Sequence, residues 1–202
     1  MPRSTYFAAG IGRSLERFQN INFHPNNVYF GLHSDYFKRA GIDLNYAQGT
    51  RINYTPAAGL QPFQSHGDDV QASITLRPVA RLKIDEQYIF TRMRTPTASV
   101  YLNHLTRTRI NYQFTRALSL RMIVDYNALL ENAALIDATR QKRLSGDVLL
   151  TWLLHPGTAV YVGYTDRLEN VAIYQNTIVP IGFPSTTVAR QFFAKVSYLF
   201  RF

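Results

Sequence analysis

The stretch 190–202 alternates apolar and polar side chains with a period of two. Its apolar or aromatic members are Phe192, Ala194, Val196, Tyr198, Phe200 and Phe202, and the residues between them include Gln191, Lys195, Ser197 and Arg201. Successive side chains of a β-strand point to opposite faces of the sheet, so this period predicts a strand with one apolar face and one polar face. A chain that ends in such a strand is expected to be a β-protein.

The same period recurs along the chain and predicts about ten strands. A weak first strand is expected at 4–14, and regular strands are expected at about 27–36, 40–46, 70–77, 82–90, 100–114, 118–126, 143–154, 160–164 and 190–202. Short turns are expected near 37–39, 77–80, 115–117 and 155–157. Longer polar or proline-containing connections are expected at 15–27, 54–69, 129–141 and 167–189, with a connection of intermediate length around Pro96. Short and long connections therefore alternate.

Length and composition fit a single β domain. With 202 residues we assign one domain, 1–202, in which 1–26 holds the weak strand and a loop and 27–202 holds the regular strands. The chain contains 13 Tyr and 13 Phe, which favour strands. It has no cysteine, which excludes disulfides and thiolate metal sites. No apolar run approaches the roughly 20 residues of a transmembrane helix, so any crossing of a membrane would have to use strands.

The connection lengths and the strand pattern together favour a membrane barrel. Strands of about ten residues, short turns at one end, long loops at the other and a charged polar face are typical of bacterial outer-membrane barrels. A soluble sandwich gives no reason for loop lengths to alternate. The terminal strand also resembles the closing strand of such barrels. We therefore predict an all-β, antiparallel transmembrane β-barrel of about ten strands, or the C-terminal part of a larger barrel, in the bacterial outer membrane with its short turns in the periplasm.

Five stretches carry a more specific resemblance: INYTPAAGLQPF, SITLRPVARLKIDEQYIFTRMR, RTRINYQFTRALSLRMIVDYNALL, TWLLHPGTAVYVGYTDRLEN and ARQFFAKVSYLFRF. Through them, residues 27–202 resemble the C-terminal β-barrel region of the DUF5916 family of outer-membrane proteins. The resemblance implies full-length relatives in which a family 9-like carbohydrate-binding module precedes the barrel. This sequence lacks that module and a secretory signal, so we expect a fragment of a longer exported chain, and the module's sugar binding is not carried over.

Charged side chains of the polar face form the predicted site, and all are expected to point into the barrel interior. They are Arg107, Arg109, Arg121, Asp125, Arg143, Asp147 and Lys195. The short turns set the register of their hairpins, which places Arg107 opposite Asp125 and Arg143 opposite Glu169. Two interpretations stay open. The paired charges either fill and rigidify a small barrel, or line a cationic path for anionic or sugar solutes.

The apolar face is expected to contact lipid. Residues predicted to lie in hydrocarbon are Ile84, Val124, Leu150, Val160 and Val162. An aromatic girdle is predicted near the periplasmic end of the strands, and its members are Tyr112, Phe114, Trp152, Tyr198, Phe200 and Phe202. The expected hairpin register places Trp152 opposite Val160. Glu86 interrupts the apolar face, and nothing in the sequence explains it.

The sequence shows no pattern of catalytic or metal-binding residues. Its five histidines lack metal-ligand spacing, and phosphate-binding loops and nucleophile elbows are absent. We interpret Gly67-Asp68-Asp69 as a solvated acidic turn of a loop rather than a calcium site. The prediction is a protein that is not an enzyme, with no catalytic residues, no metal and no cofactor.

The predicted function is passive. The formal charge of +9 is spread along the chain, which argues against a nucleic-acid surface. We expect a pore or uptake channel, or a membrane anchor for the missing N-terminal carbohydrate-binding domain. The expected partners are outer-membrane lipid, the barrel-insertion machinery that reads the C-terminal strand, and anionic or sugar solutes. The alternatives are a soluble basic β-domain that binds nucleic acid or an acidic polymer, and an outer-membrane hydrolase whose Ser and His the fold brings together.

Overall fold

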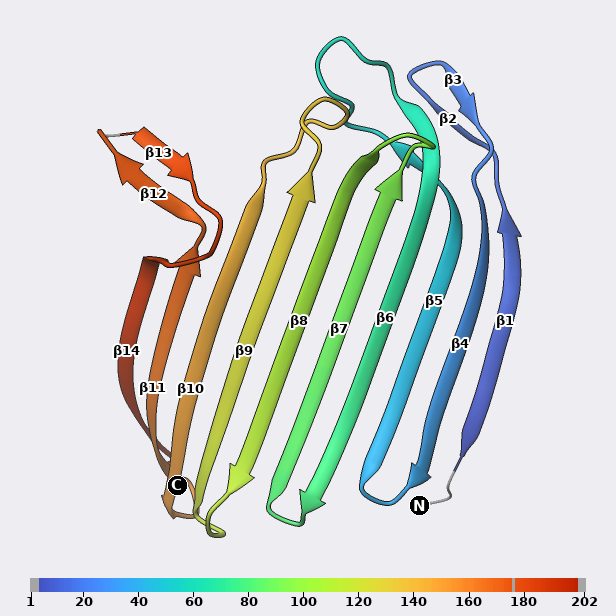
Figure 1. Cartoon of the computed structure of the whole chain (residues 1–202). Helices are drawn as coiled ribbons and strands as arrows, with labels where there is room; N and C mark the ends of the chain where they lie inside the picture. The colour runs from blue at the N-terminus through green and yellow to red at the C-terminus, as the bar shows by residue number, and fades with distance from the viewer. Residues whose placement is uncertain (1–3, 176, 200–202) are drawn as a thin grey trace. The chain divides into compact units, whose positions relative to one another are not determined.

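A computed structural model describes residues 4–175 and 177–199 and shows one large antiparallel sheet (Figure 1). In sheet order its ten strands are β1 (Thr5–Arg13), β4 (Asn26–Phe37), β5 (Ala40–Asn53), β6 (Phe63–Val79), β7 (Leu82–Arg94), β8 (Ser99–Gln113), β9 (Leu118–Glu131), β10 (Gln141–His155), β11 (Thr158–Glu169) and β14 (Thr186–Tyr198). The predicted all-β fold with about ten long strands is confirmed. In the described part of the chain, no helix is long and apolar enough to cross a membrane.

These ten strands do not close into a barrel. In the described residues the hydrogen-bonded order begins at β1 and ends at β14, so each of these strands has one partner, β4 and β11 respectively. Closure requires the first and last strands of a sheet to pair, and the sheet order contains no such pair. The prediction that ten strands form a complete barrel is therefore wrong for this part of the chain, whereas membership of a larger barrel stays a prediction.

The short turns lie close to their predicted places, although β6 continues to Val79 and leaves only 80–81 for the turn expected at 77–80. Strands β10 and β11 are joined through Pro156 and Gly157, and Gly157 adopts a φ of 91° that a glycine accepts without strain. The register of this hairpin pairs Trp152 with Val160 and Arg143 with Glu169, as expected. The register shifts by one residue at a bulge between Leu153 and His155, next to the turn. Beyond the bulge, the alternation of apolar and polar side chains determines which residues face each other, and this alternation can be read from the sequence.

Several strands are longer than their apolar segments. Strand β6 begins at Phe63, although 54–69 was expected to be a loop, and its first residues include Gln64, His66 and Asp68. The ladder of backbone hydrogen bonds needs no apolar side chain, so a strand can continue where its side chains become polar. The acidic turn predicted at Gly67-Asp68-Asp69 is wrong for this reason: these residues lie within β6.

Two short hairpins stand where loops were expected. Strands β2 (Glu16–Phe18) and β3 (Ile21–Phe23) pair with each other, and so do β12 (Val171–Tyr174) and β13 (Thr177–Pro180). The turn between β2 and β3 consists of Gln19 and Asn20, with φ of 48° and 64°. Two successive left-handed residues form the turn that suits the twist of a hairpin, and Asn-Gly is its usual sequence. Gln-Asn lacks the glycine, which is why this hairpin was not predicted.

The contacts divide the chain into two compact units, which we describe separately. Unit 1 contains the described residues of 1–74, 87–105 and 127–141, and unit 2 contains those of 75–86, 106–126 and 142–202. In unit 1 the connection after β5 pairs with the connection after β9 through a bridge between Pro56 and Ile136. The Asn53 side chain, itself buried, donates a hydrogen bond of 2.9 Å to the Leu135 carbonyl. Buried apolar side chains of this unit are Phe23, Ile52, Met93, Val100 and Ala128.

Candidate functional site on the polar face of the sheet

In unit 2, Arg107 of β8 and Asp125 of β9 form a two-pronged ion pair. The Nε atom of Arg107 donates to Asp125 Oδ1 at 2.6 Å, and its Nη2 donates to Oδ2 at 3.0 Å. This arrangement orients both side chains more strictly than a single contact would. The predicted pairing of these two residues is confirmed, and it shows that they share one face of the sheet.

The neighbouring hairpin repeats the arrangement. Nε of Arg143 donates to Glu169 Oε1 at 2.9 Å, and the Thr165 hydroxyl donates to Asp147 Oδ1 at 2.5 Å. Each contact joins residues that are directly opposite in the β10–β11 register. Charged and hydroxyl groups therefore satisfy one another across the strands of this face.

The remaining predicted site residues keep an unbalanced positive charge. Arg109 lies close enough to Asp85 to interact with it electrostatically, and Lys195 is in register with Tyr161. Within the described ranges, no ion pair shorter than 4 Å is formed by Arg109, Arg121 or Lys195, and all three are exposed. We call the face that carries these residues, together with the two hairpin pairs above, the polar face of unit 2.

The opposite face of unit 2 is apolar and exposed. Across β10, β11 and β14 the rows are Trp152, Val160 and Val196, then Leu150, Val162 and Ala194, then Val148, Tyr164 and Phe192. Trp152 is 51% exposed, and Phe192 and Val196 are both 69% exposed. Large apolar side chains therefore form a continuous surface on one side of these strands.

The aromatic residues predicted to form a girdle lie at the short-turn end of these strands where the structure describes them. Tyr112 and Phe114 form an edge-to-face pair with ring centroids 4.8 Å apart. Tyr198 is exposed and in register with Thr158, the first residue of β11. Phe200 and Phe202 lie outside the described residues. Contact of any of these side chains with lipid stays a prediction.

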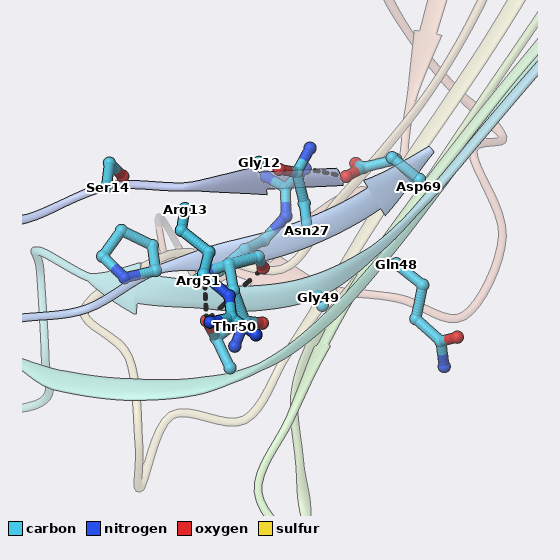
Figure 2. Close-up of a pocket in the computed structure, with 13 residues that line it drawn as sticks. Gly12, Arg13, Ser14, Asn27, Gln48, Gly49, Thr50, Arg51 and Asp69 are labelled. Carbon is cyan, nitrogen blue, oxygen red and sulfur yellow. Dashed lines mark hydrogen bonds and ion pairs between the residues drawn. The ribbon is translucent and has the colours of Figure 1, made fainter. Parts of the chain in front are cut away.

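In unit 1, a glycine-lined pocket of about 390 Å³ opens between β1, β4, β5 and β6 (Figure 2). Gly12, Asn27 and Gly49 are opposite one another in the register of three strands. A Cβ atom at Gly49 would collide with the Asn26 backbone, so this position requires glycine. Arg51 forms an ion pair with Asp69 at one side of the pocket.

A second cluster of unit 1 was not predicted as a site. The carboxylate of Asp68 has a side chain only 6% exposed and accepts hydrogen bonds from Arg92, at 2.9 Å from Nε and 2.7 Å from Nη2. His66 lies 3.8 Å from the same carboxylate. Arg94 Nε also lies 3.8 Å from it. The clue in the sequence was the continuation of the two-residue period beyond Phe90, where the apolar positions give way to these two arginines.

This cluster borders an open pocket of about 990 Å³, which we call the arginine pocket. Its lining includes Gln48, His66, Arg92 and Arg94, with the tight turn 95–98 between β7 and β8. The Gln48 amide nitrogen donates a hydrogen bond of 3.0 Å to His66 Nε2. Gln48 is in register with Val28 and Ile11, which places the pocket on the apolar side of the sheet in this unit.

Further polar contacts interrupt the apolar side of β7 and β8. In unit 2 the Thr108 hydroxyl donates to Glu86 Oε2 at 2.5 Å. In unit 1 the Tyr88 hydroxyl lies 2.8 Å from His104 Nδ1. The unexplained Glu86 therefore has a partner on the next strand, because a buried or half-buried carboxylate needs a donor.

The first hairpin of the chain is held to the connection after β5. The Tyr54 hydroxyl donates to Glu16 Oε1 at 2.8 Å, and the Tyr54 ring packs edge-on against Phe18 with centroids 5.2 Å apart. Hydrogen bonding to the Glu16 carboxylate raises the pKa of Tyr54 above its ordinary value, with burial and the charge of Glu16 acting in the same direction. The contact therefore depends on a protonated phenol.

The chain matches no protein-family model and no curated protein. Among residues 4–175 and 177–199, no three His, Cys, Asp or Glu side chains are grouped so that they could hold a metal ion.

Proposed function

We propose that the chain forms part of the wall of a larger β-barrel in the bacterial outer membrane, with its polar face toward a water-filled interior and its apolar face toward lipid. The observation that carries this proposal is the segregation of the two faces in unit 2. The pairs Arg107–Asp125 and Arg143–Glu169 lie on one face, whereas exposed apolar side chains such as Trp152, Phe192 and Val196 occupy the other over most of its length. A continuous apolar surface of this kind is a liability in water and is what a strand presents to lipid.

The extent of the apolar surface also supports a membrane position. Asp166 follows Pro156, which lies in the short turn, by ten positions. Its carboxylate accepts a hydrogen bond of 3.0 Å from Arg190, on the side of β11 and β14 that is apolar from the turn up to this pair. Ten residues rise roughly 26 Å along the membrane normal at about 3.4 Å per residue and a tilt of about 40°. The apolar band of outer-membrane barrels is about 25 Å tall. In this proposal the charged pair lies at the outer boundary of the hydrocarbon.

The open edges of the sheet are consistent with a larger barrel. In the described residues, β1 and β14 each have one edge without a partner strand. Membrane proteins do not leave a strand edge unpaired in hydrocarbon, because its backbone N–H and C=O groups would have no hydrogen-bond partners there. Further strands must therefore complete the sheet if it lies in a membrane. The resemblance of residues 27–202 to the C-terminal barrel region of the DUF5916 family points in the same direction.

The interior we propose favours anionic or sugar solutes. Arg109, Arg121 and Lys195 leave positive charge on the polar face, and such charge attracts anions in a narrow channel with low-dielectric walls. Pairs such as Arg107 with Asp125 favour a second candidate function, in which the interior is filled and the barrel serves as a membrane anchor.

The sole tryptophan provides the decisive experiment. In vesicles made from lipids brominated on their acyl chains, we expect strong quenching of Trp152 fluorescence, because bromine quenches on contact. The matched control is the double variant Trp152→Phe, Tyr161→Trp, whose tryptophan lies on the polar face, and we expect little quenching of it. Equal quenching of both proteins would contradict the assignment of the faces. A monodisperse protein without lipid or detergent would favour the soluble basic β-domain.

A further inference from the structure

The arginine pocket lies where the apolar side of the unit 1 strands becomes polar. Along β6, Val70 and Ile74 are followed toward the long-loop end by Asp68 and His66 on the same side. Along β7, Arg92 follows Leu82 by ten positions, which corresponds to roughly 26 Å along the membrane normal at about 3.4 Å per residue and a tilt of about 40°. If the strands cross the membrane as proposed, the pocket opens at the level of the outer-leaflet headgroups.

The charges of the pocket suit an anion. Arg92 is committed to Asp68, whose carboxylate is buried, so these two charges neutralise each other. The Nε atom of Arg94 is 3.8 Å from Asp68 Oδ2, which is too far for a hydrogen bond, and the Arg94 side chain is 44% exposed. Within the described residues, the Arg94 guanidinium therefore lines the pocket without accepting groups in hydrogen-bond range. A guanidinium binds phosphate oxygens through two parallel hydrogen bonds.

The remaining lining adds polar groups to the pocket. The turn 95–98 is held by a hydrogen bond of 2.8 Å from the Thr95 amide to the Ala98 carbonyl. The Ser65 hydroxyl donates to the Arg94 carbonyl, which fixes the backbone that carries the free guanidinium. Gln48 and His66 provide further polar groups in the lining. A pocket of about 990 Å³ is large enough for a phosphorylated headgroup.

We infer that the arginine pocket binds the phosphate of an anionic lipid headgroup in the outer leaflet, with Arg94 as the principal contact. This inference rests on the proposed membrane location. It goes beyond that proposal because it assigns a specific lipid site to residues on the outside of the barrel wall, whereas the proposed function concerns the interior.

Spin-labelled lipids test the site directly. The protein is reconstituted in phosphatidylcholine vesicles that contain a trace of spin-labelled phosphatidic acid or spin-labelled phosphatidylcholine. We expect the wild type to hold phosphatidic acid about fivefold more strongly than phosphatidylcholine, the factor expected for one arginine near an anionic lipid surface. In Arg94→Gln we expect the protein to hold the two labelled lipids about equally, because the cation that binds the phosphate is gone. Arg94→Lys should retain part of the preference for phosphatidic acid. The control Arg121→Gln removes the same charge from the polar face and should leave the preference unchanged.

Each outcome decides between the possibilities. The same preference in Arg94→Gln and Arg121→Gln would overturn the inference. So would loss of the wild-type preference on addition of millimolar inorganic phosphate, because it would identify free phosphate as the ligand. If Trp152 is quenched by brominated lipids but the wild type shows no preference, the lipid site is wrong and the membrane location stands. If Trp152 is not quenched, both proposals are wrong.

Discussion

At the scale of single residues, the strength of the ion pairs on the polar face depends on whether water reaches that face. Arg107 has a side chain that is 45% exposed, and its partner Asp125 is 27% exposed. Exposed pairs of this kind stabilise proteins by only about 0.2–1 kcal/mol, whereas breaking a buried pair costs about 3–5 kcal/mol. The strength of one pair therefore distinguishes a wet interior from a filled one. The sequence predicted this pair because strand parity and one tight turn determine which side chains meet.

A double-mutant cycle measures that strength. We expect Arg107→Gln, Asp125→Asn and the double variant to give a coupling of less than about 1 kcal/mol in urea unfolding from lipid vesicles, since water screens the charges. A coupling above about 3 kcal/mol would show that the pair is shielded from water and would favour the membrane anchor.

Introducing the same charge at neighbouring positions on opposite faces should lower the free energy of unfolding by different amounts. Placing arginine at Leu150, on the apolar face, should lower the free energy of unfolding in vesicles by about 2–4 kcal/mol, because a cation near the middle of the bilayer is poorly solvated. The matched variant Thr151→Arg puts the charge on the polar face and should cost much less. Similar losses for the two variants would contradict the proposed orientation of β10.

At the scale of elements, the short turns were predictable and the loop-end structures were not. The turn between β10 and β11 carries Pro and Gly and was located from the sequence. The hairpin β2–β3 turns on Gln19 and Asn20, a pair that lacks the glycine usual in such turns. The polar start of β6 was missed because periodicity of apolar residues cannot detect a strand without them. The Asp68 cluster was missed with it.

The β2–β3 hairpin should loosen when its contact to Tyr54 is lost. Hydrogen-exchange protection of residues 16–23 should fall in Tyr54→Phe, which retains the ring contact with Phe18 but removes the hydrogen bond to Glu16. Because the folded state raises the pKa of Tyr54, the contribution of this contact is complete below pH 10 and is lost as pH rises through the raised pKa. Unchanged protection in the variant at pH 8 would show that the hairpin is held by packing alone.

At the scale of the whole molecule, alternation along single strands predicted a ten-strand sheet but could not decide its closure. Register within a hairpin depends on a few adjacent residues, whereas closure depends on β1 and β14, which are far apart in sequence and have no common turn. The pairing of distant edges leaves no pattern in either strand. That is the physical reason why the predicted ten-strand barrel was wrong while the strand count was right.

Electrical recording of the full-length protein in planar bilayers tests the channel. We expect current steps that favour anions and a reduced preference in the double variant Arg109→Ala, Arg121→Ala, which removes two unpaired cations from the polar face. Arg190→Ala, which removes a cation from the apolar face, serves as the control and should leave selectivity unchanged. A silent wild type would favour the anchor.

If the chain inserts into a membrane as proposed, the edges of β1 and β14 that are unpaired in the described residues affect how it behaves before insertion. An unpaired strand edge is a template for another strand, and here each edge lies beside exposed apolar side chains such as Phe7 and Phe192. In water, pairing between copies competes with insertion. Insertion is first order in protein, whereas pairing between copies is at least second order, so dilution should raise the refolding yield steeply. If the proposed membrane location holds, we expect the chain to need, in the cell, a chaperone that shields strand edges until insertion.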